Sequence, residues 1–167
     1  MTSESSKSPE TTDAVAPSPF HLKVILVPLD FSELSLKSLQ YAVPLAKQFG
    51  ATLTLLHVLK APAGAMDSAY LASLGHQQLT VIERRLEEMI PSEVPLETAV
   101  RQNFVTDGIL EVAREISADL IIATIRDDFG VKDLLLRSTA ENLVRKAPCP
   151  VLVLHDGERD FVEPTSP

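Results

Sequence analysis

The sequence has a single cysteine, no long apolar run and no recognisable export signal. With Cys149 alone, an internal disulfide and a clustered thiolate metal site are both excluded. No apolar run approaches the ~18 residues that a membrane helix needs, so we expect no spanning segment and no membrane partner. The start, MTSESSKSPETTDAVAPSP, has neither the basic beginning nor the apolar core of a secretory signal. These absences predict a cytoplasmic protein.

Basic residues are also outnumbered, since 15 Lys and Arg face 23 Asp and Glu, for a net charge of −8. Binding to a phosphate backbone requires a basic field, so we expect no nucleic-acid partner. Residues 1–22 and 156–167 are rich in Ser, Thr, Pro and acids, a composition that predicts disordered tails. One domain, residues 23–155, remains between them.

Glycine is scarce where common phosphate-binding loops need it. After the first predicted strand the chain reads Asp30-Phe31-Ser32-Glu33, and no G-x-x-x-x-G-K-[ST] occurs anywhere. A dinucleotide fingerprint and a P-loop are therefore excluded. A phospho-receiver is disfavoured as well, because the third predicted strand runs into Gln102-Asn103-Phe104 without an acceptor aspartate.

Five apolar runs predict strands, and helical stripes separate them. Polar alternation in the third run is typical of a sheet edge, and the fourth is so apolar that it is the candidate for the sheet centre. The predicted strands are residues 23–29, 52–59, 94–101, 120–125 and 150–154. Parallel pairing of such alternating elements gives a three-layer α/β sandwich, whose ligands bind beyond the carboxyl ends of the strands.

The predicted helices carry start and stop signals. Ser32 starts the first, Gly50 ends it, and Pro44 inside it predicts a bend. Residues 67–90 form the second, whose first half is less regular. Thr106 or Asp107 caps the third, and a capping box of Ser138 and Glu141 starts the fourth.

Few side chains suggest chemistry. His57 lies inside an apolar strand and is interpreted as a hydrogen-bonded structural histidine rather than a catalytic one. Cys149 is interpreted as a small buried side chain. Asp127 and Asp128 are read as solvated acids rather than a metal pair, so we expect no metal site. The helix start at Ser138 is a candidate anion site, although its capping box uses the same donors.

Several separated blocks resemble the universal stress protein (UspA-like) family. The opening KVILVPLDFSELSLKSLQYAVPLAKQFGATLTLLHV is similar to the start of that domain, and LLLRSTAENLVRKAPCPVLVL is similar to its end. The resemblance implies a parallel five-stranded sheet of order 3-2-1-4-5, an adenine nucleotide alpha hydrolase-like fold. It also implies a homodimer, commonly through the last strand, and a role in stress responses.

Family members divide into those that bind ATP and those that do not. The nucleotide-binding branch has an aspartate after strand one, matched by Asp30, and a final Ser or Thr in its phosphate loop, matched by Ser138. The three glycine positions of that loop fall on Thr124, Asp127 and Arg137. The spacing is kept, and each glycine is replaced.

Two hypotheses follow. The first is a non-enzymatic stress-response module that acts through dimerisation and protein contacts, binds no cofactor and has lost the usual ATP-binding glycine motif. The alternative is an ATP- or AMP-binding universal stress protein, in which Asp30 and Ser138 hold the nucleotide in a modified cleft. No residue is assigned a catalytic role in either. The identity of the stress and of the protein partners is not encoded in any pattern of the sequence.

Overall fold

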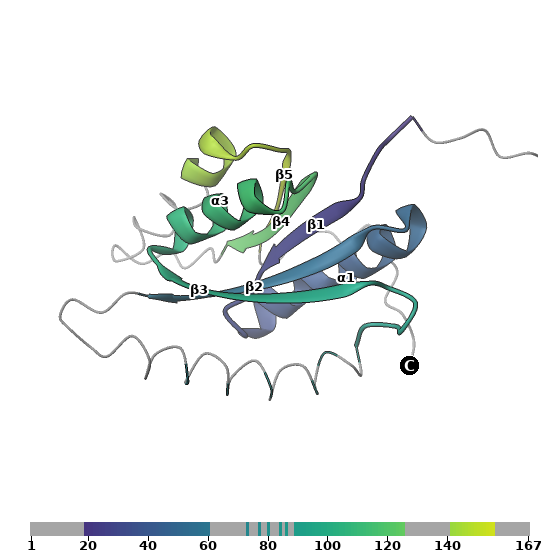
Figure 1. The fold of residues 1–167 in the computed structure, drawn as a ribbon, viewed down its shortest axis with the longest axis horizontal. Helices are drawn as coiled ribbons and strands as arrows, with labels where there is room; N and C mark the ends of the chain where they lie inside the picture. Colours follow the sequence, from purple (N-terminus) through teal and green to yellow (C-terminus); the bar gives the residue numbers. More distant parts are fainter. Residues whose placement is uncertain are drawn as a thin grey trace, which may run out of the picture.

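Five parallel strands form one sheet, with helices on both of its faces (Figure 1). The computed structural model describes residues 19–60, 89–125 and 141–155, together with 73, 77, 80, 84 and 86. The sheet order is β3-β2-β1-β4-β5, which confirms the implied order and the α/β architecture. The elements are β1 (Val24–Pro28), α1 (Glu33–Phe49), β2 (Thr52–Lys60), β3 (Leu96–Asn103), α3 (Val105–Glu115), β4 (Leu120–Ile125) and β5 (Val151–His155).

Two hydrophobic clusters hold the three layers together. Successive side chains of a strand point to opposite faces, so Ile25 packs toward Leu39 of α1 while Leu26 packs toward Val112 of α3. A helical segment at 141–146 lies beside α3 on that second face (Figure 1). Because both faces of the sheet are buried, the inner strands are nearly continuous apolar runs.

The predicted ends of α1 are confirmed. Ser32 is the N-cap, and its side chain accepts a hydrogen bond from the Ser35 N–H. Gly50 is the C-cap, with a φ of 63° in the left-handed region that glycine adopts without strain. The helix includes Pro44 in its interior, as predicted.

Three predictions about the elements are wrong by more than a one-residue shift of a strand end. The third strand is Leu96–Asn103 instead of 94–101, because the Val94 N–H closes a turn on the Pro91 carbonyl (3.0 Å) before the strand begins. The strand at the centre of the sheet is β1, and β4 lies between it and the edge strand β5. After α3 the chain crosses to the other side of β1. Strand β1 therefore lies between the pair β2 and β3 and the pair β4 and β5.

The third error concerns the start of α3. Its N-cap is Phe104, without a side-chain cap bond among the described residues, so Thr106 and Asp107 lie inside the first turn. The Asn103 side chain accepts a hydrogen bond from the Phe104 N–H (2.8 Å) and turns the chain directly from β3 into the helix. The helix therefore starts before the residues that its composition favours as caps.

Several predictions fall outside the described residues. These are the predicted tails at 1–22 and 156–167, of which only residues 19–22 are described, most of the second predicted helix, and the connection 126–137 with the helix start at Ser138. The described residues at 73, 77, 80, 84 and 86 are helical, in agreement with the second predicted helix. No helix in the described part of the chain has both the length and the apolarity to cross a membrane.

Candidate functional site

The carboxyl ends of β1 and β4 form the switch point of the sheet. From β1 the chain continues to β2 on one side, whereas β4 pairs with β1 on the other side. Ligands of open α/β sheets bind at such a point. Asp30 follows β1 and is exposed, and Thr124 lies near the end of β4 and is half-buried. The structure thus brings two residues of the predicted cleft to one edge, while Ser138 lies outside the described residues.

Asp30 is engaged in the turn that begins α1. Its Oδ1 atom accepts hydrogen bonds from the Ser32 backbone N–H (3.0 Å) and from the Ser32 hydroxyl (2.5 Å). The second distance is typical of a hydroxyl that donates to a carboxylate. Ser32 Oγ accepts in turn from the Ser35 N–H (3.1 Å), so the carboxylate orients the residue that caps the helix. Asp30 therefore has a structural task that requires no ligand.

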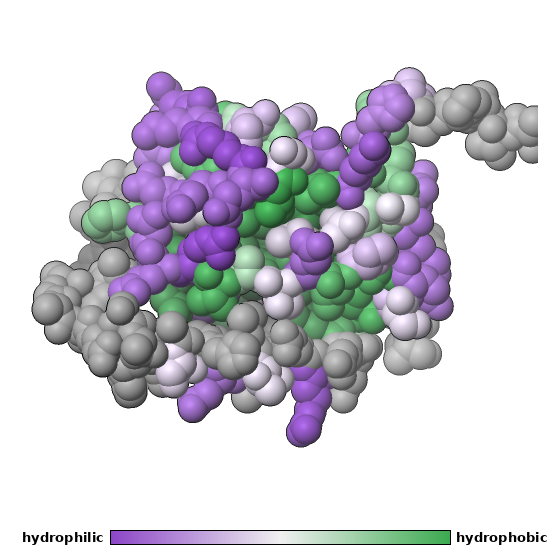
Figure 2. All heavy atoms as spheres, in the orientation of Figure 1, coloured by the Kyte–Doolittle hydropathy of each residue, from purple (hydrophilic) through white to green (hydrophobic). Residues whose placement is uncertain are grey.

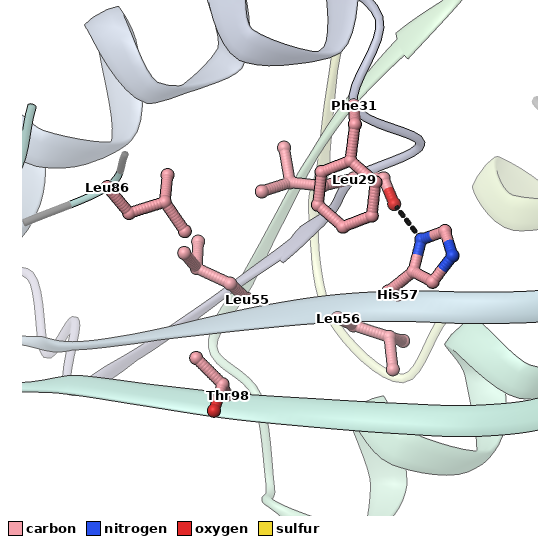
Figure 3. Close-up of a pocket in the computed structure, with 7 residues that line it drawn as sticks. All are labelled: Leu29, Phe31, Leu55, Leu56, His57, Leu86 and Thr98. Atoms are coloured by element: carbon pink, nitrogen blue, oxygen red, sulfur yellow. Dashed lines mark hydrogen bonds between the residues drawn. The ribbon is translucent and has the colours of Figure 1, made fainter. Parts of the chain in front are cut away.

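Phe31, which follows β1, and His57 of β2 are in contact just beyond the end of β1 (Figure 3). Their ring centroids are 4.5 Å apart, with the ring planes tilted by 35°. Phe31 has a φ of 66°, a left-handed conformation that non-glycine residues rarely adopt. His57 Nδ1 lies 2.8 Å from the Leu29 carbonyl oxygen, and because a carbonyl only accepts, Nδ1 carries the hydrogen. The prediction of a hydrogen-bonded histidine is confirmed, and its ring supports the strained turn.

A small apolar pocket opens beneath these two rings (Figure 3). Its interior space is about 10 Å³, roughly the room that a single water molecule needs. This pocket alone is therefore too small for a nucleotide. It is lined by Leu29, Phe31, Leu55, Leu56, His57, Leu86 and Thr98.

No group of three or more His, Cys, Asp or Glu side chains suited to a metal ion occurs among the described residues. Asp127 and Asp128, the pair considered from the sequence, lie outside them. The described part of the site therefore consists of one acid, two aromatic rings in tilted contact and an apolar floor.

Comparison with known proteins assigns the family. A model of the universal stress protein family matches residues 21–155. The chain belongs to the universal stress protein family. The matched residues include all five strands, so the whole sheet and its switch point belong to the universal stress protein domain.

Individual relatives and solved structures agree with this assignment. Universal stress protein G of Salmonella typhimurium is 33% identical over 144 residues, which cover 79% of this chain and 98% of the relative. The solved structure of UspA from Lactobacillus plantarum is 23% identical, with a TM-score of 0.67, and the match covers 81% of this chain and 99% of that one. A universal stress protein from Archaeoglobus fulgidus, solved in complex with dAMP, is 20% identical, with a TM-score of 0.54 and coverage of 80% and 97%. Both structural matches show a shared fold.

A second acidic residue, Asp119, accepts hydrogen bonds at the amino ends of β1 and β4, at the other end of these strands of the universal stress protein sheet from Asp30. Its Oδ2 atom accepts hydrogen bonds from the backbone N–H groups of Lys23 (2.8 Å) and Val24 (3.0 Å). The Asp119 N–H also donates to the Val24 carbonyl (2.9 Å). These bonds join the beginnings of β1 and β4. The sequence carried a weak signal for them, because an acid immediately precedes the fourth strand.

Cys149 lies near Asp119 and packs partly buried against the α3 side of the core. Burial, and then the negative charge of Asp119, raise the pKa of the Cys149 thiol above its ordinary value. Since the thiolate is the reactive form, this environment suppresses reactivity at neutral pH. The interpretation of Cys149 as a packing residue is consistent with this chemistry.

Proposed function

We propose that this universal stress protein is a non-enzymatic, cytoplasmic module that acts in a stress response through dimerisation and protein contacts, without the usual ATP site. The observation that carries the proposal is the set of residues at the phosphate-loop positions. Thr124, Asp127 and Arg137 stand where the nucleotide-binding branch has glycines. Thr124 belongs to β4 and is paired with Leu154 of β5, so its backbone is part of the sheet.

Both sterics and charge support the loss of ATP binding. Glycines in a phosphate loop let backbone N–H groups approach phosphate oxygens without an intervening Cβ. Asp127 and the adjacent Asp128 add negative charge to that loop. Two like charges at contact distance repel by about 1 kcal/mol each in water, and more where solvent is excluded. A polyphosphate would meet this repulsion at the place where relatives attract it.

The geometry of Asp30 supports the proposal from the other side of the cleft. The residue matches the family aspartate beside the adenosine, but its Oδ1 atom accepts both hydrogen bonds of the Ser32 turn. The retention of this aspartate is therefore explained by the start of α1. It does not require a nucleotide.

A second candidate function is binding of ATP or AMP through Asp30 and Ser138 in a modified cleft. The Archaeoglobus fulgidus protein solved with dAMP favours it, because that chain has the same fold. Arg126 and Arg137 would supply the positive charge that the loop otherwise lacks. If the first function is correct, ATP binding requires the loop glycines that this chain has lost. If the second is correct, ATP or AMP binds without those glycines.

A calorimetric titration with ATP and Mg²⁺ separates them. We expect wild-type protein to bind more weakly than about 10 µM, an affinity equivalent to roughly 7 kcal/mol. A variant with Thr124→Gly, Asp127→Gly and Arg137→Gly together should bind at least about tenfold more tightly. The matched control replaces the same three residues by alanine, which removes the charges but keeps each Cβ. Wild-type binding tighter than that limit, and lost on Asp30→Asn, would overturn the proposal.

Dimerisation is proposed to use β5, the edge strand next to β4. Val151, Leu152 and Val153 are only half-buried within one chain, so a second copy would cover apolar surface and an open edge. Val153 is the suitable probe, because it is not among the described members of either core cluster.

We expect light scattering to give the mass of a dimer at about 50 µM protein, a concentration at which weak specific interfaces are still populated. Val153→Lys should give a monomer, because a buried lysine opposes strand pairing at the edge. Its circular dichroism should match that of wild type. A wild-type monomer at that concentration would remove dimerisation from the proposal.

A further inference from the structure

Leu29 follows β1, and both of its backbone polar groups bond to residues of β2. The paired register of the two strands ends at Pro28, opposite Leu56. Just beyond that pair, the Leu29 N–H still donates to the Leu56 carbonyl (2.8 Å), as in a further step of a parallel ladder. Leu29 is 4% exposed, so its carbonyl oxygen also needs a donor from the protein.

The imidazole of His57 provides this donor in place of the backbone. At the other end of the strand pair, the Thr52 N–H donates to the Lys23 carbonyl (2.7 Å). The same spacing would bring the Val58 N–H to the Leu29 carbonyl. That carbonyl accepts instead from His57 Nδ1 (2.8 Å). A side chain therefore occupies the acceptor that the next ladder bond would use.

His57 lies on the face of the sheet that α1 covers. Leu55, two residues earlier in β2, belongs to the cluster that includes the buried residues of α1, and alternate residues of a strand share a face. The hydrophilic side chains that gather over α3 and the helix at 141–146 lie on the other face (Figure 2). The bond to His57 therefore directs the Leu29 carbonyl toward α1, out of the plane of the sheet (Figure 3).

The chain turns away from β2 immediately after this bond. Phe31 has its left-handed φ of 66° two residues later, and its ring contacts the same imidazole. Asp30, between Leu29 and Phe31, bonds to the residue that caps α1. Rotation of the peptide between Leu29 and Asp30 into the plane of the sheet would displace both the carboxylate and the strained residue.

We propose that His57 is a positioning residue that ends β1 and holds the Asp30 turn at the switch point of the sheet. Two donors, the His57 imidazole and the Val58 N–H, compete for the Leu29 carbonyl. The segment therefore has a second arrangement, in which the ladder is one bond longer and Asp30 no longer supports the start of α1. This inference depends neither on the loss of ATP binding nor on dimerisation.

Substitutions at His57 separate the effect of the donor from that of the ring. His57→Asn places an amide N–H close to the position of Nδ1 and should keep the turn. His57→Phe is its counterpart, because it keeps an aromatic ring beside Phe31 and removes the donor. His57→Leu also removes the donor, in a strand already rich in leucine, and replaces the phenylalanine variant if that variant folds poorly.

Hydrogen exchange at single amides measures which arrangement each full-length variant adopts. The Ser35 amide reports the cap of α1, since it donates to Ser32 Oγ, and the Ile122 amide of the buried strand β4 serves as the reference. In His57→Phe we expect the Ser35 amide to exchange about tenfold faster and the Val58 amide about tenfold slower than in wild type. In His57→Asn both rates should stay within about threefold of wild type.

NMR of the wild-type protein tests the bond without any substitution. We expect the ring hydrogen on Nδ1 and a scalar coupling from Nδ1 across the hydrogen bond to the Leu29 carbonyl carbon. A hydrogen on Nε2 alone would overturn the proposal. So would unchanged exchange of Ser35 and Val58 in the variants without a donor, or changes in His57→Asn as large as in those variants.

Discussion

Replacing Asp119 by alanine should lower the free energy of unfolding by about 2 kcal/mol, because the side chain holds the first residues of two strands together. Both bonds are made to a charged acceptor, and such bonds contribute about 1.5–3 kcal/mol each before solvent competes for exposed donors. Lys23 is exposed and the Val24 bond is partly buried, so part of that sum is recovered by water. Chemical denaturation of the variant and of wild type measures the difference.

Asp119→Asn is the matched control for this prediction. Both strand bonds are accepted by a single oxygen, Oδ2, so one amide oxygen is sufficient to keep them. We expect the asparagine variant to lose less than about 1 kcal/mol, since only the charge is removed. An alanine variant as stable as wild type would show that the two bonds contribute nothing to the fold.

Asp30→Ala should lower the free energy of unfolding by about 1.5 kcal/mol without changing the interaction with nucleotide. Loss of N-cap support accounts for about 1 kcal/mol, and loss of a negative charge near the start of α1 accounts for the remainder. Calorimetry with ATP and denaturation of the same sample give the two quantities together. This prediction separates a structural role of Asp30 from a ligand-binding role. Replacing an aspartate that only binds ligand leaves the free energy of unfolding unchanged or raises it.

Two further variants define the role of the turn. Asp30→Asn keeps an oxygen that accepts both Ser32 bonds, and we expect its stability to lie within about 0.5 kcal/mol of wild type. Ser32→Ala removes the cap while leaving the carboxylate in place, and should lose about 1 kcal/mol. If Asp30→Ala matched wild type while Ser32→Ala lost stability, the assigned link from Asp30 to the helix would be incorrect.

Much of the fold was predictable because its signals are local. The fourth strand was predicted with its observed bounds, Leu120–Ile125, since a short apolar run between an acid and a polar loop has few alternatives. Ser32 and Gly50 were recognisable as helix ends from the residues themselves. The order of the strands was not encoded locally and came from the family resemblance alone.

The errors and omissions share a physical cause, which is dependence on distant partners. The Asp119 carboxylate bonds to the backbone of Lys23 and Val24, which lie 96 and 95 positions earlier in the sequence. No local pattern encodes such a pairing. The start of β3 depends on the turn at Pro91, and the start of α3 depends on where β3 ends. The ion pair of Arg101 with Glu115 likewise joins residues 14 positions apart, and it forms only once β3 and α3 lie side by side.

The central claim, that the usual mode of ATP binding is lost, is tested most directly by thermal unfolding of wild-type protein with ATP and Mg²⁺. A ligand at about 500 times its Kd stabilises the folded state by roughly 3.7 kcal/mol, which raises the Tm of a domain of this size by about 10 °C. With about 5 mM ATP, we predict a rise in Tm of less than about 1 °C relative to Mg²⁺ alone. A rise of about 10 °C, corresponding to a Kd near 10 µM, would contradict the account.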